Sequence, residues 1–240
     1  MKRRKGIGLW LPGLLLIGAG IALLGYPYVS SFLRKQETNG TIRRYQQQMA
    51  EKTDLSWELK RAEEYNKSLL QQDTRFYDAF SEEEAETASE YLTLLNADEE
   101  GLMGYLQIPS ISLELPIYHG TSKEVLADAC GHQPGSSLPV GGPSAHVVLC
   151  GHTGLPSAKL FTNLDQMKIG DAFVLNVFGR CLEYQVDQIQ IVLPDELGDL
   201  EIAEGMDYVT LMTCTPYGIN SHRLLVRGAR VPQGSSGTDF

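Results

Sequence analysis

A cysteine and an arginine stand at the facing ends of two β-like segments near the C-terminus. The alternating run 208–213 ends on Cys214, and a second alternating run carries Arg223 after a turn-rich stretch with Pro216 and Gly218. A hairpin would place Arg223 beside Cys214. A positive neighbour favours the thiolate, which is the nucleophilic form, and a guanidinium can hold a developing oxyanion. These residues therefore predict cysteine-based acyl transfer.

Acyl transfer also needs a group that protonates the leaving amine, and His152 meets this requirement. His152 follows the apolar run 147–150 and Gly151, so we expect it at the end of a strand, as we expect for Cys214. If the two strands are near neighbours, the imidazole and the thiol face each other across a groove. Spacing alone leaves open that the two residues are unrelated.

The other histidines and cysteines are expected to be structural. His119 and His132 flank turns, and His146 begins an apolar strand. The other cysteines have no CxxC and no Cys/His ligand spacing, so we predict no metal site and no cofactor. We expect Cys130, Cys150 and Cys181 to be small buried apolar residues. Cys130 and Cys150 are the pair that could form a disulfide.

The N-terminal end is basic and apolar, whereas the remainder is acidic. Lys and Arg number 20 and Asp and Glu 30, and six of the basic residues precede residue 36, where there is no acid. The acidic remainder argues against a nucleic-acid partner. Residues 6–33 are uncharged and long enough to span a bilayer, and the basic segment 1–5 marks the cytoplasmic side. We predict a single-pass signal-anchor in the cell membrane with an extracytoplasmic catalytic domain; a cleaved signal peptide is the alternative.

The pattern changes twice after this anchor. Residues 34–72 are polar with apolar side chains at three- and four-residue steps, which predicts a helical stalk. Residues 73–81 break this pattern, and a capping box of Ser81 with Glu84 then opens a predicted helix over about 82–96. From Gly101 on, seven or eight short β-like runs between Gly/Pro turns predict an all-β barrel or sandwich. The tail 233–240 is expected to be disordered.

The segment Thr210-Leu211-Met212-Thr213-Cys214 resembles the TLxTC signature of sortases, the cysteine transpeptidases of the Gram-positive cell surface. Gly151-His152 and Arg223 match the other two catalytic positions of that family. Three further stretches look like class C, the pilin-polymerising sortases: GSSLPVGG (135–142), LPSAKLFTNL (155–164) and TCTPYGINSHRLLVRGAR (213–230). The resemblance covers about residues 74–231. It implies a mainly β catalytic domain over 82–232, with an eight-stranded sortase-type β-barrel, N-terminal helices and a single N-terminal transmembrane helix.

The resemblance also implies a role for each residue. Cys214 would attack the Thr–Gly carbonyl of an LPxTG-type sorting signal, Arg223 would orient the substrate and stabilise the oxyanion, and His152 would protonate the departing glycine amine. A pilin lysine would then resolve the thioacyl enzyme into an isopeptide bond. The implied partners are pilin or surface-protein substrates that carry such signals, together with the acceptor lysine of a pilin.

Class C sortases carry a lid whose Asp-Pro-aromatic motif covers the active site, and residues 73–81 resemble it. Asp78-Ala79-Phe80 stands in place of that motif, so Asp78 would pair with Arg223 and Phe80 would cover Cys214. Alanine does not fix φ as proline does, which predicts a more mobile lid. Cys150 is another departure, because threonine is expected before the Gly-His pair.

Three alternatives stay open from the sequence. A housekeeping-type sortase would attach surface proteins to a cell-wall peptide, and a catalytically silent surface scaffold would keep only the fold. A papain-like or cell-wall cysteine peptidase usually places its cysteine at a helix start, whereas Cys214 is predicted to end a strand. The complete set of three residues and the lid-like segment favour a class C sortase.

Overall fold

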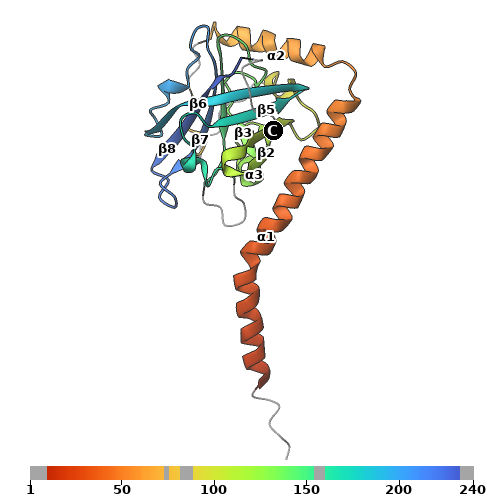
Figure 1. The fold of residues 1–240 in the computed structure, drawn as a ribbon, viewed down its shortest axis with the longest axis vertical. Helices are drawn as coiled ribbons and strands as arrows, with labels where there is room; N and C mark the ends of the chain where they lie inside the picture. The colour runs from red at the N-terminus through yellow and green to blue at the C-terminus, as the bar shows by residue number, and fades with distance from the viewer. Residues whose placement is uncertain (1–9, 73–75, 82–88, 154–159, 233–240) are drawn as a thin grey trace, which may run out of the picture.

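Eight strands close into a barrel within the part of the chain that the computed structural model describes, residues 10–72, 76–81, 89–153 and 160–232 (Figure 1). They are β1 (Leu102–Ile108), β2 (Leu113–His119), β3 (Cys130–His132), β4 (Ala145–Cys150), β5 (Ala172–Val177), β6 (Arg180–Val192), β7 (Asp207–Thr215) and β8 (His222–Arg230). Their order around the barrel is β1-β2-β3-β4-β7-β8-β6-β5. The predicted eight-stranded, mainly β fold is confirmed.

Strand alternation divides the side chains of β4, β7 and β8 between two faces. One face turns inward, where Leu149, Val209, Leu211 and Val226 belong to the main apolar core. The other face turns outward and carries Cys214 at the end of β7, because residues two apart share a face. Val209 and Leu211 therefore pack inside the barrel.

The pairing of β4 with β7 is parallel, and so is that of β2 with β3. The sequence did not predict β3, which has three residues and is too short to show alternation. The connection after β2 contains a short helix, α3 (Lys123–Asp128), whose Ser122 side chain accepts a hydrogen bond from the Val125 amide. Polar side chains that accept amide hydrogen bonds stabilise helix starts.

The N-terminal helices are α1 (Trp10–Glu51) and α2 (Ser56–Leu69). The predicted segment 34–72 is helical, but it does not stand apart from the barrel. Ile42 and Tyr45 are buried against β1, and the Tyr45 hydroxyl donates to the Met103 carbonyl and accepts from the Phe178 amide. The three- and four-residue spacing thus marks the face of each helix that packs on the barrel.

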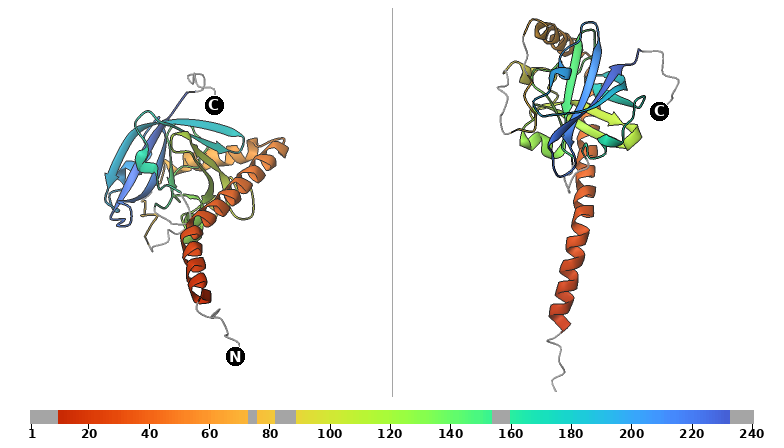
Figure 2. Two further views of the ribbon diagram at one scale, coloured as in Figure 1. Left: turned by 60° about the horizontal axis from the view of Figure 1, so that its bottom comes forward. Right: turned by 90° about the vertical axis from the view of Figure 1, so that its left-hand side faces the viewer.

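The N-terminal half of α1 projects away from the barrel (Figures 1 and 2). Within the described residues, this is the helix whose length and apolar composition suit a membrane span. Its apolar side chains, such as Leu16, Leu23 and Leu24, are more than two-thirds exposed.

The prediction of a continuous helix over about 82–96 is wrong for its described part. Residues 91–93 form a single 3₁₀ turn, and Leu95 adopts a positive φ of 51°. Tyr91, Leu94 and Leu95 are all buried in the barrel's apolar core or against it, so tertiary packing overrides the local helix signal. Ser81 lies before this turn, and its predicted capping partner Glu84 lies outside the described residues.

Three histidines predicted to be structural are buried and hydrogen-bonded. His132 is fully buried; its Nε2 donates to the Ser137 carbonyl at 2.9 Å, and its Nδ1 lies 2.8 Å from the Tyr91 hydroxyl. Burial lowers the pKa of His132 to about 3 and also lowers the pKa of His119 and of His146. These rings are therefore neutral in the folded protein at neutral pH.

Acid should destabilise the fold through His132. Because its folded pKa lies below the usual value of about 6.5, its contribution to stability is complete above that pH and declines as the pH falls toward 3. The expected slope is about 1.4 kcal/mol of unfolding free energy per pH unit for one such group. Urea unfolding measured from pH 7 to 4 should show at least this slope, because His119 and His146 act in the same direction, and His132→Gln should reduce the slope by about the contribution of one group. Equal slopes in both proteins would contradict the assignment.

Candidate active site

The strand register brings the three predicted catalytic residues together. In the parallel pair, Cys150 of β4 lies opposite Met212 of β7. His152 and Cys214 each follow that position by two residues, so both lie at the same level. In the antiparallel pair, Cys214 of β7 lies directly opposite Arg223 of β8. Neighbouring strands are about 4.8 Å apart, so the three residues occupy consecutive strand ends.

Local contacts fix His152 beside β7. The Gly151 amide donates to the Met212 carbonyl at 3.1 Å, and the Thr213 hydroxyl donates to the Gly151 carbonyl at 2.6 Å. A Cβ on residue 151 would lie 2.8 Å from the Phe161 ring, which packs against this glycine. Glycine before the histidine is thus required by the close approach of Phe161.

Arg223 is buried, and the described residues use all of its side-chain nitrogens. Its Nε and Nη2 donate to the two carboxylate oxygens of Asp78 at 2.7 and 2.6 Å, and its Nη1 donates to the Asn220 and His222 carbonyls at 2.9 Å each. A two-point arginine–carboxylate pair is strong and fixed in geometry. The pairing predicted between Asp78 and Arg223 is confirmed.

Residues 76–81 are the described part of the predicted lid, and they close over the three strand ends. The Phe80 ring lies 5.4 Å from the His152 ring and 5.3 Å from the Arg223 guanidinium carbon. Phe80 thus lies against His152 and Arg223, the two residues on either side of Cys214. Gln133 donates to the Tyr77 carbonyl at 3.2 Å and holds the lid from the other side.

An apolar cluster beneath the lid was not predicted from the sequence. Its centre is the outward face of β4, β7 and β8, and the loop between β6 and β7 supplies two leucines. We call it the lid cluster: Ala79, Leu126, Val148, Cys150, Leu197, Leu200, Met212 and Leu225. The signal that could have found it is the run of apolar residues at consecutive positions of β4 and β7, since strands with two buried faces do not alternate.

In the folded protein the thiol is not in the expected ionised state. Burial raises the pKa of Cys214, Arg223 lowers it and Asp78 raises it, with a result of about 11. The prediction that Arg223 favours the thiolate is right in sign for that one interaction, but burial is the larger effect. Burial also lowers the pKa of His152. With the lid closed, the thiol and the imidazole are therefore both neutral at pH 7.

The remaining cysteines are free thiols. Cys130 and Cys150 are buried, as expected, and form no disulfide with each other. Cys181 is exposed, so the prediction that it is buried is wrong; it follows the β5–β6 turn and faces away from the core. Among the described residues, no group of His, Cys, Asp and Glu side chains could hold a metal ion.

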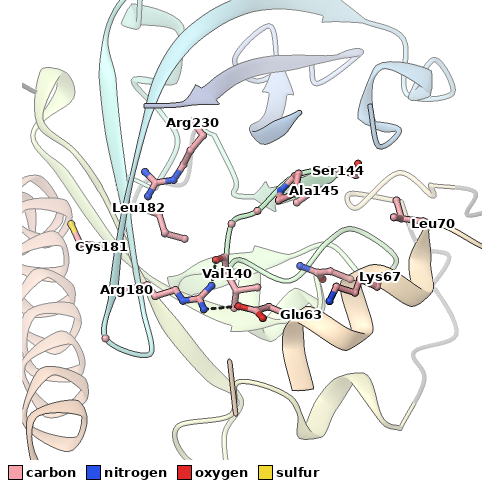
Figure 3. A pocket seen from close by; sticks show the side chains of 15 residues that line it. Glu63, Lys67, Leu70, Val140, Ser144, Ala145, Arg180, Cys181, Leu182 and Arg230 are labelled. Atoms are coloured by element: carbon pink, nitrogen blue, oxygen red, sulfur yellow. Dashed lines mark hydrogen bonds and ion pairs between the residues drawn. The ribbon is translucent and has the colours of Figure 1, made fainter. Parts of the chain in front are cut away.

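A pocket of about 880 Å³ lies away from these residues (Figure 3). It is lined by α2, the segment 140–145, the β5–β6 turn and the end of β8. Arg180 in its wall donates to Glu63 and to the Val140 carbonyl, at 2.6 Å each. Its lining contains none of the lid residues or predicted catalytic residues, so it is separate from the candidate active site.

Comparison with known proteins gives a family match and close structural neighbours. A family profile described as "Sortase domain" matches residues 106–231. Sortase C-1 from Actinomyces oris is 46% identical and superposes with a TM-score of 0.70, covering 75% of this chain and 100% of that chain. Sortase C1 from Streptococcus agalactiae is 45% identical, with a TM-score of 0.72 and coverages of 80% and 98%. "Sortase A" of Bacillus anthracis is 26% identical over 216 residues, 90% of each chain.

Asp78→Asn should activate the thiol. The change removes a negative charge beside Cys214 and weakens the lid, so the pKa of Cys214 should fall from about 11. Each pKa unit lost raises the thiolate fraction about tenfold at pH 8. Iodoacetamide labelling of Cys214, located by mass spectrometry because Cys181 also reacts, should accelerate by about that factor.

Asp187→Asn is the matched control for this experiment. Asp187 makes the same two-point pair with an arginine of β8, Arg227, at 3.0 and 2.8 Å. It lies outside the lid, so its replacement should leave the labelling rate of Cys214 unchanged. Equal acceleration by both variants would show that Asp78 acts only through general stability.

Ala79→Pro should stiffen the lid. Proline restricts its own φ and the preceding residue, which lowers the entropy of the open segment. Amides of residues 76–81 should exchange with deuterium more slowly in Ala79→Pro than in the natural chain, and faster in Ala79→Gly. If the natural chain is as protected as Ala79→Pro, the expectation of a more mobile lid is wrong.

Proposed function

Since the chain belongs to the sortase family of cysteine transpeptidases, we propose that it is a class C enzyme acting in pilus assembly. It cleaves an LPxTG-type sorting signal between Thr and Gly and transfers the acyl group to a pilin lysine. The supporting observation is the arrangement of His152, Cys214 and Arg223 on three neighbouring strand ends, under a lid whose Asp78 occupies the guanidinium. Similarity to sortase C structures supports the class.

The first half-reaction forms a thioester. Cys214 gives its proton to His152 as its sulfur attacks the threonine carbonyl carbon, and the carbonyl oxygen becomes an oxyanion held by Arg223. The C–N bond to glycine then breaks, and the His152 imidazolium gives the proton to the departing amine. Arg223 can take this role once Asp78 has left, because in the closed state Asp78 accepts from two of its nitrogens.

The second half-reaction transfers the acyl group. A neutral lysine amine attacks the thioester carbon, and Arg223 again holds the oxyanion. Collapse expels the Cys214 sulfur, the attacking nitrogen loses a proton to His152, and an isopeptide bond remains. Attack by water would hydrolyse the thioester by the same steps. The acceptor amine must therefore be held close to the thioester carbon in order to react faster than water.

The lid cluster is suited to the acyl side of the sorting signal. When the lid withdraws, Ala79 leaves the apolar surface of Val148, Met212 and Leu225. The leucine and proline of the signal can then cover this surface, while the threonine carbonyl reaches Cys214. Apolar contact here would also exclude water from the thioester.

Sortases are cell-surface enzymes, and the proposed location follows from α1. Residues 6–33 would cross the cell membrane once, residues 1–5 would stay in the cytoplasm, and the catalytic domain would lie outside. The exposed apolar side chains of the N-terminal half of α1 support this placement. A membrane position near the secretion route would bring the site to substrates that emerge from the cell.

The housekeeping alternative differs in the acceptor amine. The observation that supports this alternative is the similarity to "Sortase A" of Bacillus anthracis over 90% of the chain. The lid-like segment 73–81 and the run 215–223 favour class C, because both resemble that class. A direct comparison of a pilin lysine with a cell-wall peptide amine as acceptor decides between them.

The decisive experiment uses the full-length chain in detergent with a fluorescent LPxTG peptide. We expect a thioacyl adduct on the natural chain by mass spectrometry, more adduct on Asp78→Asn, and none on Cys214→Ala. Cys181→Ala, which removes an exposed thiol, is the matched control and should form the adduct normally. Addition of a lysine-bearing pilin should convert the adduct into an isopeptide product. An absence of adduct in every lid state would favour the silent scaffold.

A further inference from the structure

The loop between β6 and β7, residues 193–206, forms one wall of the lid cluster, and His146 of β4 lies beneath it. We propose that His146 is a positioning residue that holds this loop against β7 and so sets the width of the site that receives the acyl side of the substrate. This inference rests on the proposed function for its substrate, and the contacts of His146 carry it.

His146 is almost completely buried and uses both ring nitrogens. Its Nδ1 lies 2.9 Å from the Glu201 carbonyl oxygen, and its Nε2 lies 2.8 Å from the Thr210 hydroxyl. A carbonyl oxygen can only accept, so Nδ1 carries the proton and Nε2 accepts from Thr210. The neutral ring in this one tautomer therefore bridges the loop and β7.

The loop has few other ties to the barrel. At its C-terminal end, the Ala145 amide donates to the Met206 carbonyl and the Gly205 amide donates to the Ser144 hydroxyl. At its start, Glu196 bonds back to Leu193 within the loop. Among the described residues, the hydrogen bond from His146 is the one that joins the middle of the loop to a strand.

The middle of the loop is the part that reaches the lid cluster. The 3₁₀ turn η4 (Gly198–Leu200) lies beside Glu201, and Leu197 and Leu200 pack into the cluster with Met212 and Leu225. A shift at Glu201 would therefore move both leucines. The acyl side of the substrate would meet these leucines directly, whereas Cys214 lies at the far end of β7.

The surroundings of His146 hold the ring in one orientation. Tyr208 packs edge-on against it with ring centroids 5.7 Å apart, and the Arg227 guanidinium lies 4.2 Å above the Tyr208 ring. Asp187 in turn fixes Arg227. The charged groups that act on the ring are Arg227, Asp187 and Asp199. Packing against Tyr208 thus fixes the His146 ring in the orientation in which it bonds to the loop.

Two substitutions separate the hydrogen bond from the bulk of the ring. His146→Asn keeps an N–H donor close to the Nδ1 position and can still reach Glu201. His146→Gln places its donor near the Nε2 position and can reach Thr210 but not Glu201. Both are carried in the Asp78→Asn chain, so that the lid does not limit binding.

We expect His146→Gln to raise the KM for the LPxTG peptide about tenfold, the effect of losing one buried hydrogen bond, with kcat changed less than about twofold. His146→Asn should keep the parental KM. Replacing the peptide's leucine by alanine should raise KM in the parent and much less in His146→Gln, because the two changes affect one contact. Equal behaviour of both variants, or a fall in kcat alone, would overturn the proposal.

Deuterium exchange of residues 193–206 gives a readout that needs no substrate. The loop amides should exchange faster in His146→Gln than in His146→Asn or the parent. If the parent does not cleave the peptide, the proposed function fails, and this comparison still tests His146. Identical exchange rates of the loop amides in all three chains would contradict the positioning role of His146, whatever the activity of the enzyme.

Discussion

The ion pair between Asp78 and Arg223 is the interaction on which the state of the candidate site depends. Arg223 has a fixed set of donors, and the lid carboxylate accepts from two of its nitrogens at 2.7 and 2.6 Å. The same donors would hold the oxyanion in the proposed reaction, so the lid and the transition state compete for one guanidinium. The pair consists of two charge-assisted hydrogen bonds, which an open, empty site would lose.

The barrel supplies the precision that this competition requires. Parallel pairing of β4 with β7 and antiparallel pairing of β7 with β8 set His152, Cys214 and Arg223 on consecutive strand ends. Contacts that carry no chemistry keep them there: the Phe161 ring against Gly151 and the Thr213 hydroxyl on the Gly151 carbonyl. The residues of the proposed reaction thus lie in strands of the barrel or directly after one, whereas the lid that would move lies outside them.

The strand pattern predicted an all-β barrel or sandwich, and the resemblance to sortases, carried by short motifs, implied the barrel and the grouping of Cys214, His152 and Arg223. The sequence could not show that Ile42 and Tyr45 pack on the barrel, since an amphipathic face does not name its partner. It missed β3, which is too short for a pattern, and it predicted a helix where Leu94 and Leu95 are drawn into the core. The raised pKa of Cys214 could not be predicted from the sequence, because Arg223 is visible there whereas burial is a property of the fold. Burial has the larger effect on this pKa.

In the proposed reaction, opening of the lid would be an exchange of partners. Asp78 and Ala79 would leave a guanidinium and an apolar surface, and a bound sorting signal would present a carbonyl oxygen and apolar side chains to the same places. A substrate shifts the lid equilibrium only by its preference for the open state, so a peptide that fills both places has the greatest effect. In the closed structure the thiol is protonated, because burial raises its pKa and Asp78 raises it further. In the proposed reaction one event would therefore govern both access and reactivity, because a substrate that displaces Asp78 would also lower the pKa of Cys214 and so favour its attack.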